Sequence, residues 1–83
     1  AFLGIVPDYR ADGATVASVI DDAPADKAGL KPGDRLTHWD GKPVDDLRRL
    51  MAMLQNADPG DTAKLTLERD GEKIQLPVKL GER

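Results

Sequence analysis

The chain has 83 residues, with 12 basic and 15 acidic side chains and a formal net charge of −3. This length predicts one domain with one modest core and little room for a deep active site. The charges are interleaved and form no basic stripe, which argues against nucleic acid as a partner. No apolar run reaches the roughly 20 residues that a membrane span needs. Without cysteine, the chain has neither disulfides nor a thiolate metal site.

The first half of the chain predicts two strands and a short helix. Residues 2–6 form an apolar run of β type that ends at Pro7. An Asp-Gly turn precedes residues 14–20, whose valines and isoleucine indicate a half-buried strand. Residues 24–29 then have the form of a very short helix, because proline suits its first turn and Gly29 suits a left-handed exit.

The second half predicts a strand over residues 35–40, a long helix over 44–55 and a hairpin of strands 63–68 and 74–80. The helix carries apolar residues at positions i, i+3, i+4 and i+7, which form a stripe along one face. These residues are Leu47, Leu50, Met51 and Leu54. Either Asp45 or Asp46 can cap the helix start, since a carboxylate there accepts from free backbone N–H groups.

This order of elements predicts an α+β fold over residues 1–83. We expect a small partial β-barrel or sandwich of about five to six mostly antiparallel strands, with one short and one long helix. The chain opens directly on strand-like residues and shows no signal peptide. We therefore expect a domain excised from a larger protein, and a monomer when it stands alone.

Five segments of the sequence resemble PDZ domains of bacterial type. They are FLGI at 2–5, APADKAGLKPGD at 23–34, DGKPV at 40–44, PGD at 59–61 and RDG at 69–71. The layout resembles the circularly permuted bacterial form, with the ligand-binding loop near the start of the chain. The sequence is similar to PDZ domains attached to secreted or periplasmic proteases and di-zinc aminopeptidases. The resemblance implies a periplasmic or secreted location in a bacterium.

The resemblance also implies a site for a peptide's terminal carboxylate. PDZ domains add an extended peptide as a strand between a sheet edge and the long helix, and loop amides receive its carboxylate. Those donors correspond to the backbone N–H groups of Leu3, Gly4 and Ile5. A glycine is expected there because a side chain would obstruct the carboxylate and because the loop must turn its amides inward. The alternative is that Gly4 only permits a tight bend.

The groove implied by the resemblance has a strand wall and a helix wall. It is lined by Leu3, Ile5 and Pro7 on the strand side and by Leu47, Met51 and Leu54 on the helix side. The helix residues could instead be ordinary core; we expect Leu54 to serve both roles and Leu50 only the core. Met51 is the best candidate for ligand specificity, because its thioether adapts to varied partners.

Two departures from the family pattern shape the expected ligand. Many PDZ domains begin the long helix with a histidine that binds a ligand hydroxyl, whereas this chain has Leu47. That favours an apolar ligand residue, rather than a hydroxylated one, two positions before the terminus. Pro7 has no N–H to donate, so the pairing strand loses one bond and binding is expected to be weak, or directed to an internal or intramolecular segment.

The expected partners are peptide or protein C-termini with apolar end residues, or the parent catalytic domain. In the second case the domain is structural or regulatory and binds no free peptide. An enzyme is the third class, but Ser18 and His38 fall on different predicted strands and no nucleophile-elbow sequence surrounds Ser18. A single histidine does not make a metal site. We therefore expect no catalytic residue, no metal and no cofactor.

Overall fold

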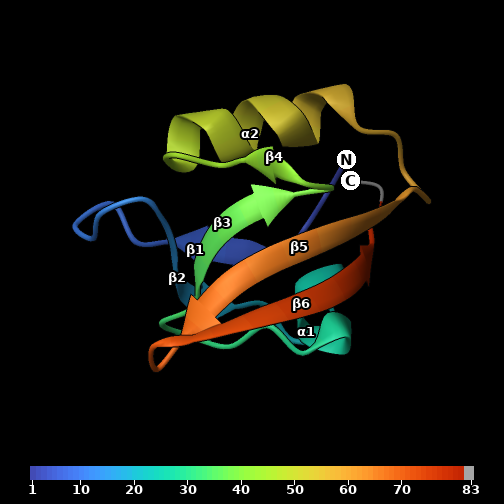
Figure 1. Ribbon diagram of the computed structural model, residues 1–83. Coiled ribbons are helices and arrows are strands. Elements are labelled where there is room, and N and C mark those ends of the chain that lie inside the picture. Colours follow the sequence, from blue (N-terminus) through green and yellow to red (C-terminus); the bar gives the residue numbers. More distant parts are fainter. Residues whose placement is uncertain (82–83) are drawn as a thin grey trace.

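The computed structural model describes residues 1–81 (Figure 1). Six strands and two helices follow one another along the chain. They are β1 (Ile5–Pro7), β2 (Ala14–Val19), α1 (Pro24–Ala28), β3 (Arg35–Trp39), β4 (Lys42–Pro43), α2 (Leu47–Asn56), β5 (Thr62–Arg69) and β6 (Glu72–Lys79). The predicted α+β class, with one short and one long helix, is confirmed.

The strands form one sheet in the order β1-β2-β3-β5-β6, with the short β4 paired to β3. Every pairing between these strands is antiparallel. β1 and β6 are therefore the two edges of the sheet. Phe2 and Gly81 exchange backbone hydrogen bonds of 2.8 and 3.0 Å, which brings the two ends of the described chain together.

The core lies between the sheet and the two helices, which Figure 1 shows at opposite ends of the sheet. Leucines of β5 and the last residues of β6 alternate inward, as the period-two pattern predicts. Trp39, at the end of β3, is buried in this core. Among the described residues, neither helix has the length and apolar character needed to cross a membrane.

Local chemistry sets the ends of both helices. The carboxylate of Asp46 accepts a 2.9 Å hydrogen bond from the Arg49 amide, so Asp46 rather than Asp45 caps α2. Pro24 starts α1, and Gly29 ends it with a left-handed φ of 101°. Both features of α1 agree with the sequence-based prediction.

The main differences from the prediction are the first strand, one additional strand and the start of the long helix; the other bounds agree within two residues. The first strand runs from Ile5 to Pro7 instead of over 2–6, because Gly4 has a φ of 87° that interrupts extended backbone. Strand β4 was not predicted, since two residues are too short to show a period. The long helix begins at Leu47 and not at 44, because the segment before the Asp46 cap lies outside the helix.

Candidate functional site

The carboxylate loop, defined here as residues Leu3, Gly4 and Ile5, is held by its carbonyl groups. The Leu3 carbonyl accepts a 2.9 Å hydrogen bond from the Ala25 amide, and the Gly4 carbonyl accepts one of 2.9 Å from the Ile20 amide. Within residues 1–81, the amides of Leu3 and Gly4 donate no hydrogen bond. Both residues are buried, so these two N–H groups are unpaired donors at a site where an acceptor is favoured.

The backbone conformation and the surroundings of Gly4 both explain why glycine stands in this loop. A Cβ at this position would lie 2.2 Å from the Cβ of Ala23, so it would point toward the segment before α1. Obstruction of a bound carboxylate by a side chain stays a prediction, and the structure shows a constraint of its own. The constraint is the left-handed φ of 87°, together with the methyl group of Ala23.

The outer edge of β1 is free of strand pairing within the described sheet. On its inner edge, the Gly4 carbonyl and the Asp8 amide both bond to residues of the β2 side. Because bonding directions alternate along an antiparallel strand, the backbone groups of Ile5 and Pro7 face outward. Ile5 thus offers a donor and an acceptor at this edge, whereas Pro7 offers only its carbonyl.

The segment 1–13, which contains β1, runs alongside α2 in the opposite direction. At one end, the Ala1 amino nitrogen lies 2.9 Å from the Leu54 carbonyl, in the last part of the helix. At the other end, a Cβ on Gly13 would lie 3.8 Å from the carbonyl oxygen of Asp45, just before the helix. The carboxylate loop is therefore near the C-terminal part of α2, and Pro7 lies further toward the helix start.

The helix residues predicted for the groove differ in burial. Leu54 is buried, Leu47 is half-buried against the core, and Met51 is 36% exposed. Leu50 has no exposed surface, which agrees with its assignment to the core alone. Met51 is therefore the residue of this stripe that is most available to a partner.

Two of the strand-side residues, Leu3 and Ile5, pack in the same core as α2. Leu3 is 2% exposed and belongs to the buried cluster that also contains Leu50 and Leu54. Ile5 is half-buried and packs against this cluster. Pro7 is also half-buried. The structure thus brings Leu3, Ile5, Leu47 and Leu54 to one core, whereas Met51 lies at the surface and Pro7 is not part of that cluster. Peptide binding by these residues stays a prediction.

An ion pair that was not predicted from the sequence joins the buried Asp34 to the half-buried Arg69. Arg69 binds the Asp34 carboxylate through Nε at 2.8 Å and Nη2 at 2.7 Å, and Nη2 also donates to the Gly29 carbonyl at 2.9 Å. Burial raises the pKa of Asp34, but hydrogen bonds from Arg69 and the Lys31 amide, with the two positive charges, outweigh it and leave the pKa below its ordinary value. Asp34 and Arg69 both stand in segments that the sequence analysis singled out, but the distance between them in the sequence does not show that they pair.

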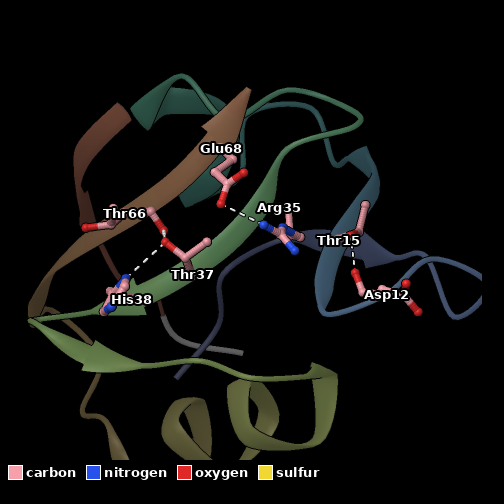
Figure 2. A network of polar contacts seen from close by, with 7 residues as sticks. All are labelled: Asp12, Thr15, Arg35, Thr37, His38, Thr66 and Glu68. Atoms are coloured by element: carbon pink, nitrogen blue, oxygen red, sulfur yellow. Dashed lines mark hydrogen bonds and ion pairs between the residues drawn. The ribbon is translucent and has the colours of Figure 1, made fainter. Parts of the chain in front are cut away.

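In the polar network of Figure 2, His38 contacts Thr37 on its own strand. His38 Nδ1 lies 3.0 Å from Thr37 Oγ1, and Thr37 Oγ1 donates to the Thr66 carbonyl at 3.2 Å. No hydrogen bond joins Ser18 and His38 among residues 1–81. In the same part of the chain, no group of three or more His, Cys, Asp or Glu residues could hold a metal ion.

Comparisons with known proteins identify a family and relatives for this chain. Residues 1–80 match the family described as PDZ domain. A probable periplasmic serine endoprotease, DegP-like, from Ectopseudomonas mendocina is 39% identical over 72 residues, or 87% of this chain and 15% of that protein. The chain therefore spans a small part of such a relative.

Solved structures of larger proteins contain the same fold. An HtrA-type protease solved with a decapeptide matches 99% of this chain, and 29% of its own, with a TM-score of 0.89 and 29% identity. An aminopeptidase N family protein from Idiomarina loihiensis matches 96% of this chain, and 14% of its own, with a TM-score of 0.84 and 26% identity. The fold of the chain thus recurs in parts of larger peptidases.

Proposed function

The chain belongs to the PDZ domain family, and from this membership we propose that it captures C-terminal or extended peptide segments by adding them as a strand to β1. PDZ domains are non-catalytic, and the catalytic domain of the HtrA relatives is separate. We further propose that the domain serves an attached bacterial peptidase in the periplasm or outside the cell. The periplasmic name of the DegP-like relative supports this location.

One observation carries the proposal. The unpaired amides of Leu3 and Gly4 adjoin the open edge of β1, where Ile5 turns its backbone outward. A terminal carboxylate is an acceptor that suits a cluster of backbone N–H groups. The strand that leads to it can pair with Ile5, each net hydrogen bond contributing about 0.5–1.5 kcal/mol.

The side walls favour an apolar ligand terminus. Leu3 and Ile5 on the strand side and Leu54 and Met51 on the helix side offer no charged group to a ligand side chain. Leu47 stands at the helix start, where it faces a position further back along the ligand. We therefore propose that apolar residues are preferred both at the terminus and near Leu47.

The test is a titration of the ¹⁵N-labelled domain with short peptides that end in Val, Leu, Ile, Phe or Ala. Each peptide is offered with a free carboxylate and with an amidated end. Saturable shifts of the Leu3, Gly4 and Ile5 amides and of α2, stronger with the free acid, are expected. If no peptide moves these signals, peptide capture is wrong, and a structural or regulatory role against a parent catalytic domain takes its place.

A matched pair of variants locates the groove. Met51→Asp places a charge on the proposed helix wall, whereas Ala52→Asp places one at the adjacent exposed position on α2. We expect the first to weaken binding of the free-acid peptides and the second to leave it nearly unchanged. Equal effects of the two variants would place the ligand elsewhere.

A further inference from the structure

Arg69 stands at one end of a chain of contacts that leads to the carboxylate loop. Its guanidinium makes three hydrogen bonds, two to the Asp34 carboxylate and one to the Gly29 carbonyl. The planar guanidinium presents its donors in a fixed fork, so the position of Asp34 fixes the direction of the bond to Gly29. Asp34 is itself held by the Lys31 amide at 2.9 Å.

Gly29 transmits this constraint to α1. The helix has only five residues, and a helix of that length does not hold its shape without tertiary contacts. Its last turn closes through bonds from the Gly29 and Leu30 amides to the Ala25 carbonyl, at 3.2 and 3.0 Å. The Gly29 carbonyl shares a peptide group with the Leu30 amide, so fixing this carbonyl from outside also fixes a donor to the Ala25 carbonyl and restrains the turn of α1 that carries Ala25.

Ala25 and Ala23 make the contact with the carboxylate loop. The Ala25 amide donates to the Leu3 carbonyl at 2.9 Å, and the methyl group of Ala23 occupies the space beside Gly4 where a side chain would otherwise lie. The Leu3 carbonyl belongs to the peptide group whose nitrogen is the Gly4 amide. A bond that orients this carbonyl therefore orients one of the two unpaired donors.

We propose that Arg69 is a positioning residue for carboxylate recognition: it holds α1, and through the Ala25–Leu3 bond it sets the direction in which the Gly4 amide points. This inference rests on the proposed peptide-binding function. Arg69 touches no ligand in this scheme. Its effect is to hold the loop in one orientation before binding, so that less ordering is required when a carboxylate arrives.

The test compares free-acid and amidated forms of the tightest peptide from the panel described above. Arg69→Met keeps an unbranched stem of about the length of the arginine Cβ–Nε segment and removes the guanidinium. We expect it to weaken binding of the free acid about threefold to tenfold, the range that ordering a few groups costs. The amidated peptide should change little, so the acid-to-amide affinity ratio should fall. An unchanged ratio overturns the proposal.

Arg35→Met is the matched control. Arg35 also pairs with a carboxylate, Glu68, at 2.6 Å, but both side chains are nearly half exposed and α1 is not involved. Its acid-to-amide ratio should equal that of the wild type. Arg69→Lys keeps the charge beside Asp34 without the planar fork, and it should show part of the loss at a smaller cost in stability. All measurements are made where circular dichroism shows each variant folded.

A second measurement needs no ligand. Hydrogen exchange of the Ala25 amide, which donates to the Leu3 carbonyl, should become faster in Arg69→Met, relative to the Leu65 amide of the central hairpin, and should stay unchanged in Arg35→Met. Equal acceleration of both amides means a general loss of stability and overturns the proposal. If the wild type binds no peptide, the function proposed above fails, whereas the exchange data still decide the role of Arg69.

Discussion

The Cβ of Ala23 lies where a side chain on Gly4 would have to begin, at a separation of 2.2 Å. Gly4 therefore meets two constraints at once, a left-handed φ of 87° and direct contact with the segment that starts α1. Backbone conformation and tertiary packing both require glycine at this position.

Gly4→Ala should destabilise the domain more than other Gly→Ala changes at left-handed positions. The φ alone costs about 1–2 kcal/mol, and the overlap with Ala23 adds to it. Gly60→Ala is the control, because Gly60 has a φ of 91° and no atom lies within 4 Å of the point where its Cβ would stand. Urea denaturation of both variants measures the difference. Ala23→Gly should recover part of the loss in Gly4→Ala, and an additive double variant would contradict the overlap.

Pro7→Ala should strengthen peptide binding. The substitution restores a backbone N–H at the outer edge of β1, next to the acceptor that the Pro7 carbonyl already offers. One added hydrogen bond of about 0.5–1.5 kcal/mol corresponds to roughly a twofold to tenfold lower Kd. Isothermal titration of the tightest free-acid peptide measures it.

Pro77→Ala serves as the control for this change, because Pro77 lies on β6, at the other edge of the sheet. Its Kd should equal that of the wild type. A Kd for Pro7→Ala that is unchanged or higher would mean that the ligand does not pair with β1 at this register.

The fold could be predicted from the sequence because its signals are local. Period-two runs at the β5–β6 hairpin, the apolar stripe of α2 and the turn residues around α1 each determine one element. The start of the first strand was missed because glycine adopts positive and negative φ about equally, so an apolar run that contains Gly4 does not show where extended backbone begins.

The site could be predicted only in part, because some of its contacts join residues that are far apart in the sequence. The resemblance placed the loop and the helix stripe, but no local pattern links Asp34, just before β3, to Arg69 at the end of β5. That pair depends on the order of strands in the sheet, where β3 lies beside β5. Likewise, the outward direction of Pro7 follows from the bonds of its neighbours to β2 and not from the sequence alone.

The domain should lose stability in acid through Asp34. Its pKa is below the ordinary value in the folded state, so the unfolded chain takes up protons first as the pH falls. The stabilisation is complete above the ordinary pKa of about 4 and is lost as the pH drops through the lower folded pKa. Thermal melts between pH 2 and pH 7 follow this loss.

Asp34→Asn isolates this contribution. The variant should be less stable than the wild type at pH 7, because Arg69 loses its charged partner at a fully buried position, and the difference should shrink toward pH 2. Asp45→Asn is the control, since Asp45 is exposed and does not cap α2. A stability difference for Asp34→Asn that is independent of pH would contradict the assignment.

Two adjacent residues of α2 should separate binding from stability. Leu50 is fully buried, so Leu50→Ala leaves a cavity and should lower the free energy of unfolding by about 2–5 kcal/mol. Met51 is 36% exposed, so Met51→Ala should cost less than about 1 kcal/mol. Binding should show the reverse order: Met51→Ala removes a ligand contact and raises the Kd, while folded Leu50→Ala keeps a Kd near that of the wild type. Urea denaturation and peptide titration of both variants give the four values. If the two substitutions change stability and affinity in parallel, Met51 is a core residue and the helix wall of the groove is misassigned.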